Sequence, residues 1–164
     1  MKTLYLLRHG KSSWKDKTLL DVERPLNGRG RSASQNVGGF LKKKKIIPDL
    51  VLSSCAIRAR QTTDLVMEAA KLRTDLRFDE RIYEAGAQRL VEVVRQIEKS
   101  KETVLLVGHN PGLEEFLKLL TANVETMPTG TLSKVVLTAS NWTGIGDKGG
   151  TLEWIVKPKR LRKV

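Results

Sequence analysis

The chain is poor in cysteine and in aromatic side chains, and each shortage narrows what the protein can be. Its 164 residues include one cysteine, Cys55, and only 5% aromatic residues. A single cysteine excludes an internal disulfide, and Cys55 has no companion at the spacing of a metal site, which agrees with a reducing compartment. We interpret Cys55 as a small buried residue beside a loop rather than as a catalytic thiol.

Long apolar runs are also missing. The longest runs, such as TVLLVGH, are far shorter than the roughly 20 residues that a membrane-spanning helix needs. The first residues lack the apolar region and small-residue cleavage site of a signal peptide. We therefore expect a cytoplasmic protein without a membrane partner. The length and the 40% apolar content suit one globular domain, residues 1–164, with a sizeable core.

Positive charge is what the chain has in excess. Thirty Lys and Arg against eighteen Asp and Glu give a formal net charge of +12, and much of it lies in residues 42–45 and in the ending KPKRLRKV. Such an excess attracts nucleic acid, a phosphorylated small molecule or an acidic protein surface without choosing among them, and each cluster is also consistent with a solvated face. The few aromatic residues argue against nucleic acid as the partner, because single strands are bound by stacking.

Short apolar runs alternate with helical patterns along the chain. We predict strands at 3–8, 49–54 and 102–109, and helices at 28–44, 57–72 and 87–99. Strands that are apolar on both faces and separated by helices indicate an α/β fold, a three-layer α/β/α sandwich with a mostly parallel central sheet. Two late strands, in TLSKVVLTAS and TLEWIVKP, leave room for one antiparallel member. A further helix is expected after the third strand, with Asn110 as N-cap and Pro111 as first residue.

Polar residues follow three of the predicted strands. Ligands of open α/β sheets bind beyond the carboxyl ends of the strands, so these residues are expected to meet at one edge. They are Arg8-His9-Gly10, Ser53-Ser54 with Arg58, and Gly108-His109-Asn110. A lone histidine at a strand end is more often structural. Two imidazoles and two guanidiniums together would bury like charge unless an anion neutralised it. Phosphate is the natural anion, because its oxygens accept from the planar guanidinium donors of arginine and from the free backbone N–H groups at the start of the following helix.

An imidazole can attack phosphorus only through a neutral ring nitrogen. Neighbouring cations would lower the pKa of the ring, and a carbonyl such as that of Gly10 would fix its tautomer. Guanidiniums and a second imidazole would stabilise the charge on the transferring group, so this chemistry needs no metal. The sequence also has no phosphate-cradling glycine-rich loop with lysine and no dinucleotide fingerprint. We therefore expect neither a metal nor a cofactor.

Five motifs follow one another along the chain: LYLLRHGKSSW, ERPLNGRG, SSCAIRARQT, LLVGHNPG and the ending WIVKPKRL. This ordered set resembles the histidine phosphatase superfamily, which has the phosphoglycerate-mutase-like fold, and most closely its SixA-type phosphohistidine phosphatase branch. The resemblance covers nearly the whole chain. It implies that His9 is the nucleophile, that His109 stabilises the transferring group, and that Arg8 and Arg58 bind the phosphoryl oxygens. Asn110, at the start of the following helix, is also expected to contribute to phosphate binding.

Two further assignments rest on the resemblance and stay open. Arg24 in ERPL is similar to an additional basic residue of the pocket in this branch, and a structural salt bridge to Glu23 or Asp21 is an equal alternative. Glu84 in RIYEAG is the candidate general acid that would protonate an ester oxygen. Pocket lining and a charge at a helix N-terminus are the other interpretations of Glu84, since phosphohistidine enzymes of this type have less need of an acid.

The chain differs from the mutases of the superfamily. Lys11 stands where many mutases and ester phosphatases carry an acidic residue, and the chain is too short for the insertions that cover a mutase site. The sequence thus favours a metal-independent phosphatase acting on protein phosphohistidine or on a small phosphomonoester. The alternatives are a phosphate-dependent interaction module without turnover and a basic nucleic-acid-binding protein. Trp14 is interpreted as a partly buried ring that anchors the first loop.

Overall fold

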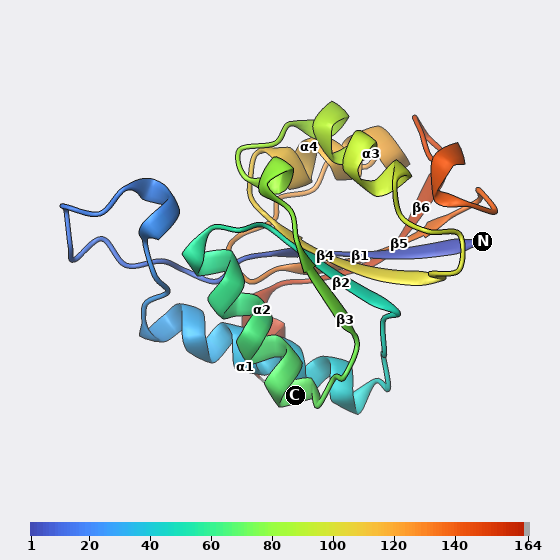
Figure 1. The fold of residues 1–164 in the computed structure, drawn as a ribbon. Coiled ribbons are helices and arrows are strands. Elements are labelled where there is room, and N and C mark those ends of the chain that lie inside the picture. The colour runs from blue at the N-terminus through green and yellow to red at the C-terminus, as the bar shows by residue number, and fades with distance from the viewer. Residues whose placement is uncertain (163–164) are drawn as a thin grey trace.

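A six-stranded sheet lies between two layers of helices in the computed structural model, which describes residues 1–162 (Figure 1). The strands are β1 (Lys2–Arg8), β2 (Leu50–Ser53), β3 (Asp75–Phe78), β4 (Thr103–Gly108), β5 (Leu132–Leu137) and β6 (Gly150–Val156). The helices are α1 (Gly28–Lys43), α2 (Ile57–Ala70), α3 (Ala87–Arg95), α4 (Gly112–Thr121) and α5 (Pro158–Leu161). Short 3₁₀ turns cover Asp21–Glu23, Glu80–Ile82 and Trp142–Gly144.

The sheet has the strand order β3-β2-β4-β1-β5-β6. β4 pairs in parallel with both β1 and β2, and β2 pairs in parallel with β3. β5 is antiparallel to its two neighbours, β1 and β6. The predicted mostly parallel sheet with one antiparallel member is therefore confirmed. Because β1 and β4 are neighbours and run the same way, the residues that follow them emerge side by side.

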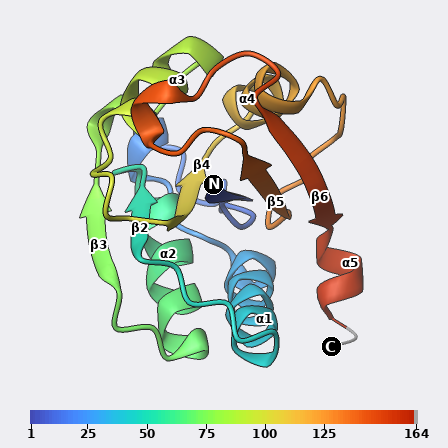
Figure 2. The same ribbon diagram turned by 90° about the vertical axis from the view of Figure 1, so that its right-hand side faces the viewer.

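Alternation along β1 shows why the fold has three layers. Leu4 and Leu6 belong to the cluster packed under α3 and α4, whereas Tyr5 and Leu7 belong to the cluster packed under α1 and α2. Three of these four side chains are completely buried and Tyr5 is 5% exposed. A strand whose apolar side chains point to both faces of the sheet must be covered on both faces. Figure 2 shows the helices α3 and α4 on one face of the sheet and α1, α2 and α5 on the other.

The predicted helices begin where the sequence indicated and end earlier. They stop at Lys43, Ala70 and Arg95 rather than at 44, 72 and 99. Strand β3 was not predicted, because it is short and lies at the exposed edge of the sheet, where DLRF offers no continuous apolar run. Cys55 is half-buried rather than buried.

Two local expectations were wrong. α4 begins at Gly112 with Pro111 as its N-cap, so neither Asn110 nor Pro111 takes the predicted position. Within the described residues, Asn110 Oδ1 accepts no hydrogen bond, and the Nδ2 amide donates to Glu114 Oε2 at 2.7 Å and to the Met127 carbonyl at 2.9 Å. Trp14 is 72% exposed rather than partly buried. The centroid of its ring lies 3.2 Å from the guanidinium carbon of Arg24, so the ring covers that cation instead of entering the core.

Candidate active site

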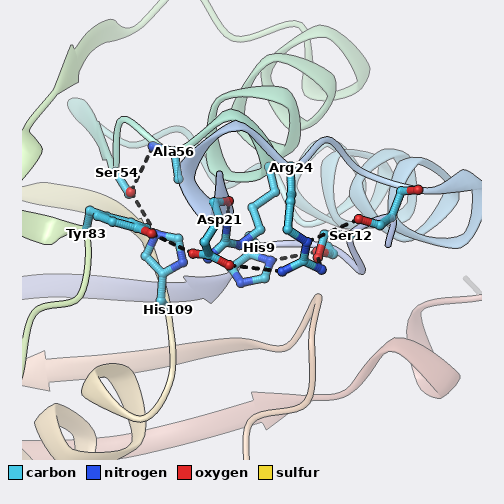
Figure 3. A network of polar contacts seen from close by, with 11 residues as sticks. His9, Ser12, Asp21, Arg24, Ser54, Ala56, Tyr83 and His109 are labelled. Atoms are coloured by element: carbon cyan, nitrogen blue, oxygen red, sulfur yellow. Dashed lines mark hydrogen bonds and ion pairs between the residues drawn. The ribbon is translucent and has the colours of Figure 1, made fainter. Parts of the chain in front are cut away.

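The two histidines of the chain meet at the carboxyl ends of β1 and β4. Arg8 is in register with Gly108, and the backbone amide of His9 donates to the Gly108 carbonyl at 3.2 Å. The imidazole rings of His9 and His109 therefore lie with their centroids 4.9 Å apart and their planes tilted by 52°. Both side chains are buried, and Figure 3 shows them beside Asp21 and Arg24. The expected convergence of strand ends is what places them together.

The His9 ring has a defined tautomer. Its Nδ1 lies 2.7 Å from the carbonyl oxygen of Gly10. A carbonyl only accepts, so Nδ1 carries the proton and Nε2 keeps its lone pair. Burial lowers the pKa of His9 to about 4, helped by the nearby Arg58, Arg8 and Arg24 charges and opposed by the bond to Gly10. The ring is therefore neutral at pH 7, with a free nitrogen on the side away from its own backbone.

Position 10 requires glycine because its backbone packs directly against the backbone of Gly30, which leaves no room for a side chain. A Cβ at Gly10 would lie 2.6 Å from the carbonyl oxygen of Gly30, near the start of α1. The Gly10 amide donates to Thr62 Oγ1 at 2.9 Å, and that hydroxyl donates to the Arg58 carbonyl at 2.7 Å. The loop that orients His9 is thus fixed to both α1 and α2, which keeps the tautomer-setting carbonyl in place.

His109 is held by Ser54, which follows the neighbouring strand β2, and by Tyr83, which follows the 3₁₀ turn Glu80–Ile82. Its Nε2 lies 2.7 Å from Ser54 Oγ, which accepts from the Ala56 amide at 3.2 Å and has its own O–H to donate to Nε2. With Nε2 as acceptor, Nδ1 carries the proton of the neutral ring. The ring of Tyr83 packs edge-on against His109 with centroids 5.5 Å apart. The pKa of His109 is lowered to about 3, mainly by burial, with the neighbouring His9 and Arg58 acting in the same direction. Ser54 and Tyr83 thus fix a second neutral imidazole that faces His9.

Asp21 joins two arginines to a tyrosine. Its carboxylate accepts from Tyr83 Oη at 2.6 Å, from Arg58 Nη2 at 3.0 Å and from Arg24 Nη1 at 3.1 Å. The bond from Tyr83 lowers the pKa of Asp21 to about 2, and the two arginines act in the same direction against partial burial. Burial, together with this carboxylate, raises the pKa of Tyr83 to about 12. Asp21 is consequently ionised and fixes both guanidiniums beside His9.

Arg8 and Asn110 face each other across the Met127 carbonyl. Arg8 Nη1 donates to that oxygen at 3.1 Å, and Asn110 Nδ2 also donates to it, at 2.9 Å. Burial lowers the pKa of Arg8, and the positive charge of Arg58 lowers it further. Among residues 1–162, five buried side-chain atoms have no hydrogen-bond partner: Arg8 Nε, His109 Nδ1, Asn110 Oδ1, Thr131 Oγ1 and Ser133 Oγ. Buried polar atoms are normally satisfied, so the unpaired donors of Arg8, which precedes His9 in the chain, and of His109, which packs against the His9 ring, mark a place where an acceptor such as an anion binds. Asn110 Oδ1 is an acceptor, so the part of Asn110 in phosphate binding stays a prediction.

Of the two roles considered for Arg24, the structure shows the salt bridge, and this bridge does not prevent Arg24 from also acting as a basic residue of the pocket. Arg24 forms the salt bridge to Asp21, not to Glu23, and also donates to Ser12 Oγ at 2.6 Å. Its charge still contributes to the lowered pKa of His9, so Arg24 lies close enough to act on the pocket. Its part in phosphate binding stays a prediction.

Glu84 is not brought into this network. It follows Tyr83 in the turn before α3, its side chain is exposed, and no hydrogen bond or ion pair joins it to another residue within 1–162. Its role as general acid stays a prediction.

Sequence reasoning missed Tyr83 and the central place of Asp21. The one signal in the sequence was the spacing of Asp21 and Arg24: opposite charges three residues apart often form an ion pair within one turn of helix, and this pair does so.

The described residues contain neither a candidate metal cluster nor a membrane-spanning helix. Within 1–162, no three His, Cys, Asp or Glu side chains come together in an arrangement that could hold a metal ion. None of the helices in that part of the chain is both long and apolar enough to pass through a bilayer.

Comparison with known proteins identifies the family. The sequence profile of the histidine phosphatase superfamily (branch 1) matches residues 4–88, which is more than half of the chain and includes His9, Arg24, Arg58 and Glu84. The chain belongs to this superfamily. An uncharacterized chloroplastic protein of Arabidopsis thaliana is 27% identical over 96% of this chain and 78% of its own length. Phosphoglycerate mutase 1 of Saccharomyces cerevisiae is 38% identical, but over 43% of this chain and 29% of the mutase.

Solved structures show the same fold. A proposed phosphohistidine phosphatase SixA from Agrobacterium tumefaciens has a TM-score of 0.81 and 27% identity, covering 96% of this chain and 98% of that one. The protein histidine phosphatase SixA complexed with tungstate has a TM-score of 0.80 and 22% identity, covering 97% and 99%. The predicted phosphoglycerate-mutase-like fold and the resemblance to the SixA branch are confirmed. The superfamily is one of phosphatases and mutases, so the chain is an enzyme of this class rather than a binding module.

Proposed function

We propose that this enzyme hydrolyses phosphohistidine on a protein, or a small phosphomonoester, through a covalent phosphohistidine formed on His9, without a metal. One observation carries the proposal. The Nδ1 proton of His9 is held by the Gly10 carbonyl at 2.7 Å, which leaves Nε2 with its lone pair. Since the pKa of His9 is lowered to about 4, the ring is neutral and nucleophilic at pH 7. A cytoplasmic location goes with this proposal.

The reaction has two displacements at phosphorus. In the first, His9 Nε2 attacks, a nitrogen–phosphorus bond forms, and the bond from phosphorus to the leaving nitrogen or oxygen breaks. In the second, water attacks the phosphorus of phospho-His9, the nitrogen–phosphorus bond breaks, and inorganic phosphate leaves. Arg8, Arg58 and the His109 Nδ1 atom are the donors for the equatorial oxygens, which carry the charge of the transferring group. These donors supply the stabilisation that a metal provides in other phosphatases.

The surrounding carboxylates favour phosphohistidine over an ester. Ester hydrolysis needs a proton on the leaving oxygen, whereas a leaving imidazole departs readily. Asp21 is the carboxylate bonded to the site arginines, and with a pKa of about 2 it holds no proton to donate near pH 7. Glu84 is exposed and outside the network. The names of the structural neighbours as phosphohistidine phosphatases support the same preference.

The test compares a phosphohistidine-bearing protein with a panel of alkyl phosphomonoesters, with a metal chelator present throughout. We expect preferential release of phosphate from phosphohistidine, an acid-labile phosphoenzyme detectable by mass spectrometry, and the loss of both in His9→Ala. Arg58→Ala should raise the concentration of vanadate or phosphate needed for inhibition by about 10- to 100-fold, because charge-assisted bonds to the oxygens are lost.

Other outcomes distinguish the alternatives. Preferential release from an ester would make this a small-molecule phosphatase and would support Glu84 as its acid. Turnover retained in His9→Ala would refute the nucleophile assignment. Binding of phosphate with no release from any substrate would restore the interaction module. Nucleic-acid affinity that falls steeply with salt and ignores His9→Ala would restore the nucleic-acid alternative.

A further inference from the structure

A groove of about 730 Å³ lies on the helical face that carries α1 and α5, outside the polar network of the histidines. Its walls are the first turns of α1, the loop of residues 128–129 and the segment 157–162. Figure 2 shows α1 and α5 next to each other on this face of the sheet. The groove therefore includes the basic C-terminal segment to which the catalytic proposal gives no role.

The charge of the groove is of one sign. No Asp or Glu lines it, and its cationic side chains are Lys11, Arg29, Lys157, Lys159 and Arg162. Among residues 1–162, none of these five forms an ion pair with a carboxylate, although Lys157 Nζ donates to Thr126 Oγ1 at 2.9 Å. Five unneutralised cations around one hollow repel one another and are stabilised by an anionic partner.

The groove adjoins the loop that carries His9. Lys11, which lines the groove, is two residues beyond His9. On the other wall, Gly130 follows the lining residue Thr129, and its amide donates to the carbonyls of Arg8 and His9, both at 3.0 Å. A substrate that presents its phosphoryl group to His9 is thereby close to both walls.

We propose that this basic groove docks an acidic segment of the phosphoprotein whose phosphohistidine enters the site. The inference rests on the proposed function and names the kind of substrate. The lining combines the five cations with the apolar side chains of Ala33, Pro128, Pro158 and Leu161, a mixture that suits a peptide with carboxylates and aliphatic groups. No aromatic residue lines it, so the stacking surface that single-stranded nucleic acid requires is missing from this groove.

The lysine run of residues 42–45 provides a matched control. Lys42 and Lys43 lie at the opposite end of α1, are exposed like Arg29 and Lys159, and do not line the groove. The double variants Arg29→Gln/Lys159→Gln and Lys42→Gln/Lys43→Gln remove the same net charge. A general effect of charge on association would appear equally in both, whereas a docking effect would appear only in the first.

The experiment uses two synthetic phosphohistidine peptides, one flanked by glutamates and one with every glutamate replaced by glutamine. Phosphate release gives kcat and KM for each, with p-nitrophenyl phosphate as a substrate that does not reach the groove. We expect Arg29→Gln/Lys159→Gln to raise KM for the glutamate peptide by about tenfold and to leave its kcat, the glutamine peptide and p-nitrophenyl phosphate unchanged. The control variant should behave like the parent protein.

Direct binding separates the two proposals. Fluorescence anisotropy with the unphosphorylated glutamate peptide measures docking without turnover, and the groove variant should lose most of this binding. Binding that depends on the groove, together with no hydrolysis of either peptide, would keep the groove and overturn the proposed function. Equal KM for both peptides in the parent protein would overturn the groove inference alone. Groove-dependent binding of tripolyphosphate or of a single-stranded oligonucleotide, without binding of the peptide, would overturn it as well.

Discussion

Both terminal nitrogens of Arg58 donate to Asp21, Nη1 to its backbone carbonyl at 2.7 Å and Nη2 to its carboxylate at 3.0 Å. The guanidinium that the proposed reaction uses is thus fixed before any phosphate arrives. Holding a charged group in place in advance removes the cost of ordering it during the reaction. Asp21 acts through Arg58 and Arg24 and is a positioning residue in this proposal.

We expect Asp21→Ala to lower kcat by about tenfold, because two guanidiniums lose their common acceptor. Tyr83→Phe removes one hydroxyl from the same carboxylate and should cost less, about two- to threefold. The measurement is kcat and KM on one phosphohistidine substrate, together with the concentration of phosphate that inhibits. An unchanged kcat in Asp21→Ala would mean that Arg58 needs no anchor.

The positions of the two histidines could be predicted from sequence, whereas the network that fixes Arg58 could not. His9 and His109 each follow an apolar run, and parallel strands bring such ends to one edge whatever the details of the loops. Asp21 belongs to the loop between β1 and α1, whose path depends on tertiary contacts such as the Trp14–Arg24 stack. Tyr83 reaches Asp21 across 62 positions of sequence, and no local pattern reports a contact of that range.

The pH dependence of stability should come largely from His9 and His109. Their pKa values are lowered to about 4 and about 3 in the folded chain, against about 6.5 when unfolded. Between pH 6.5 and 4 the unfolded chain therefore binds protons that the folded chain does not, so stability is complete above pH 6.5 and falls as the pH falls. From pH 7 to 5 we expect a loss of about 2 kcal/mol for each ring.

Urea unfolding at pH 7 and pH 5 tests this, with His9→Asn as the comparison. The variant should lose only about half as much stability over this interval, because one titrating ring remains. The acid limb of kcat/KM should also lie well below pH 6.5, since the free enzyme keeps His9 neutral. A limb centred at pH 6.5, or the same loss of stability in His9→Asn, would contradict the lowered pKa.

Glu84→Gln should leave phosphohistidine hydrolysis within about twofold of the parent rate, because a leaving imidazole does not depend on this carboxyl group. The side chain is exposed and outside the network of the histidines, so the variant should also keep its stability. Parallel kinetics on phosphohistidine and on an alkyl phosphomonoester make the comparison. A selective loss on the ester would establish Glu84 as the acid for that reaction, whereas a large loss on phosphohistidine would give it a role that this mechanism lacks.

Gly10→Ala should reduce kcat by about 100-fold while the chain remains folded, because small displacements of a reacting group have effects of this size. The new Cβ would lie 2.6 Å from the Gly30 carbonyl oxygen, so the loop must move, and with it the Gly10 carbonyl that holds the His9 tautomer. Gly39→Ala in α1 is the control, since a Cβ there meets nothing within 4 Å and should stabilise the helix by about 0.5–1 kcal/mol. Thermal unfolding and kcat, measured on both variants, separate a displaced nucleophile from general damage. If Gly10→Ala lost stability but kept its kcat, the reaction would not depend on the position of the Gly10 carbonyl that holds the His9 tautomer.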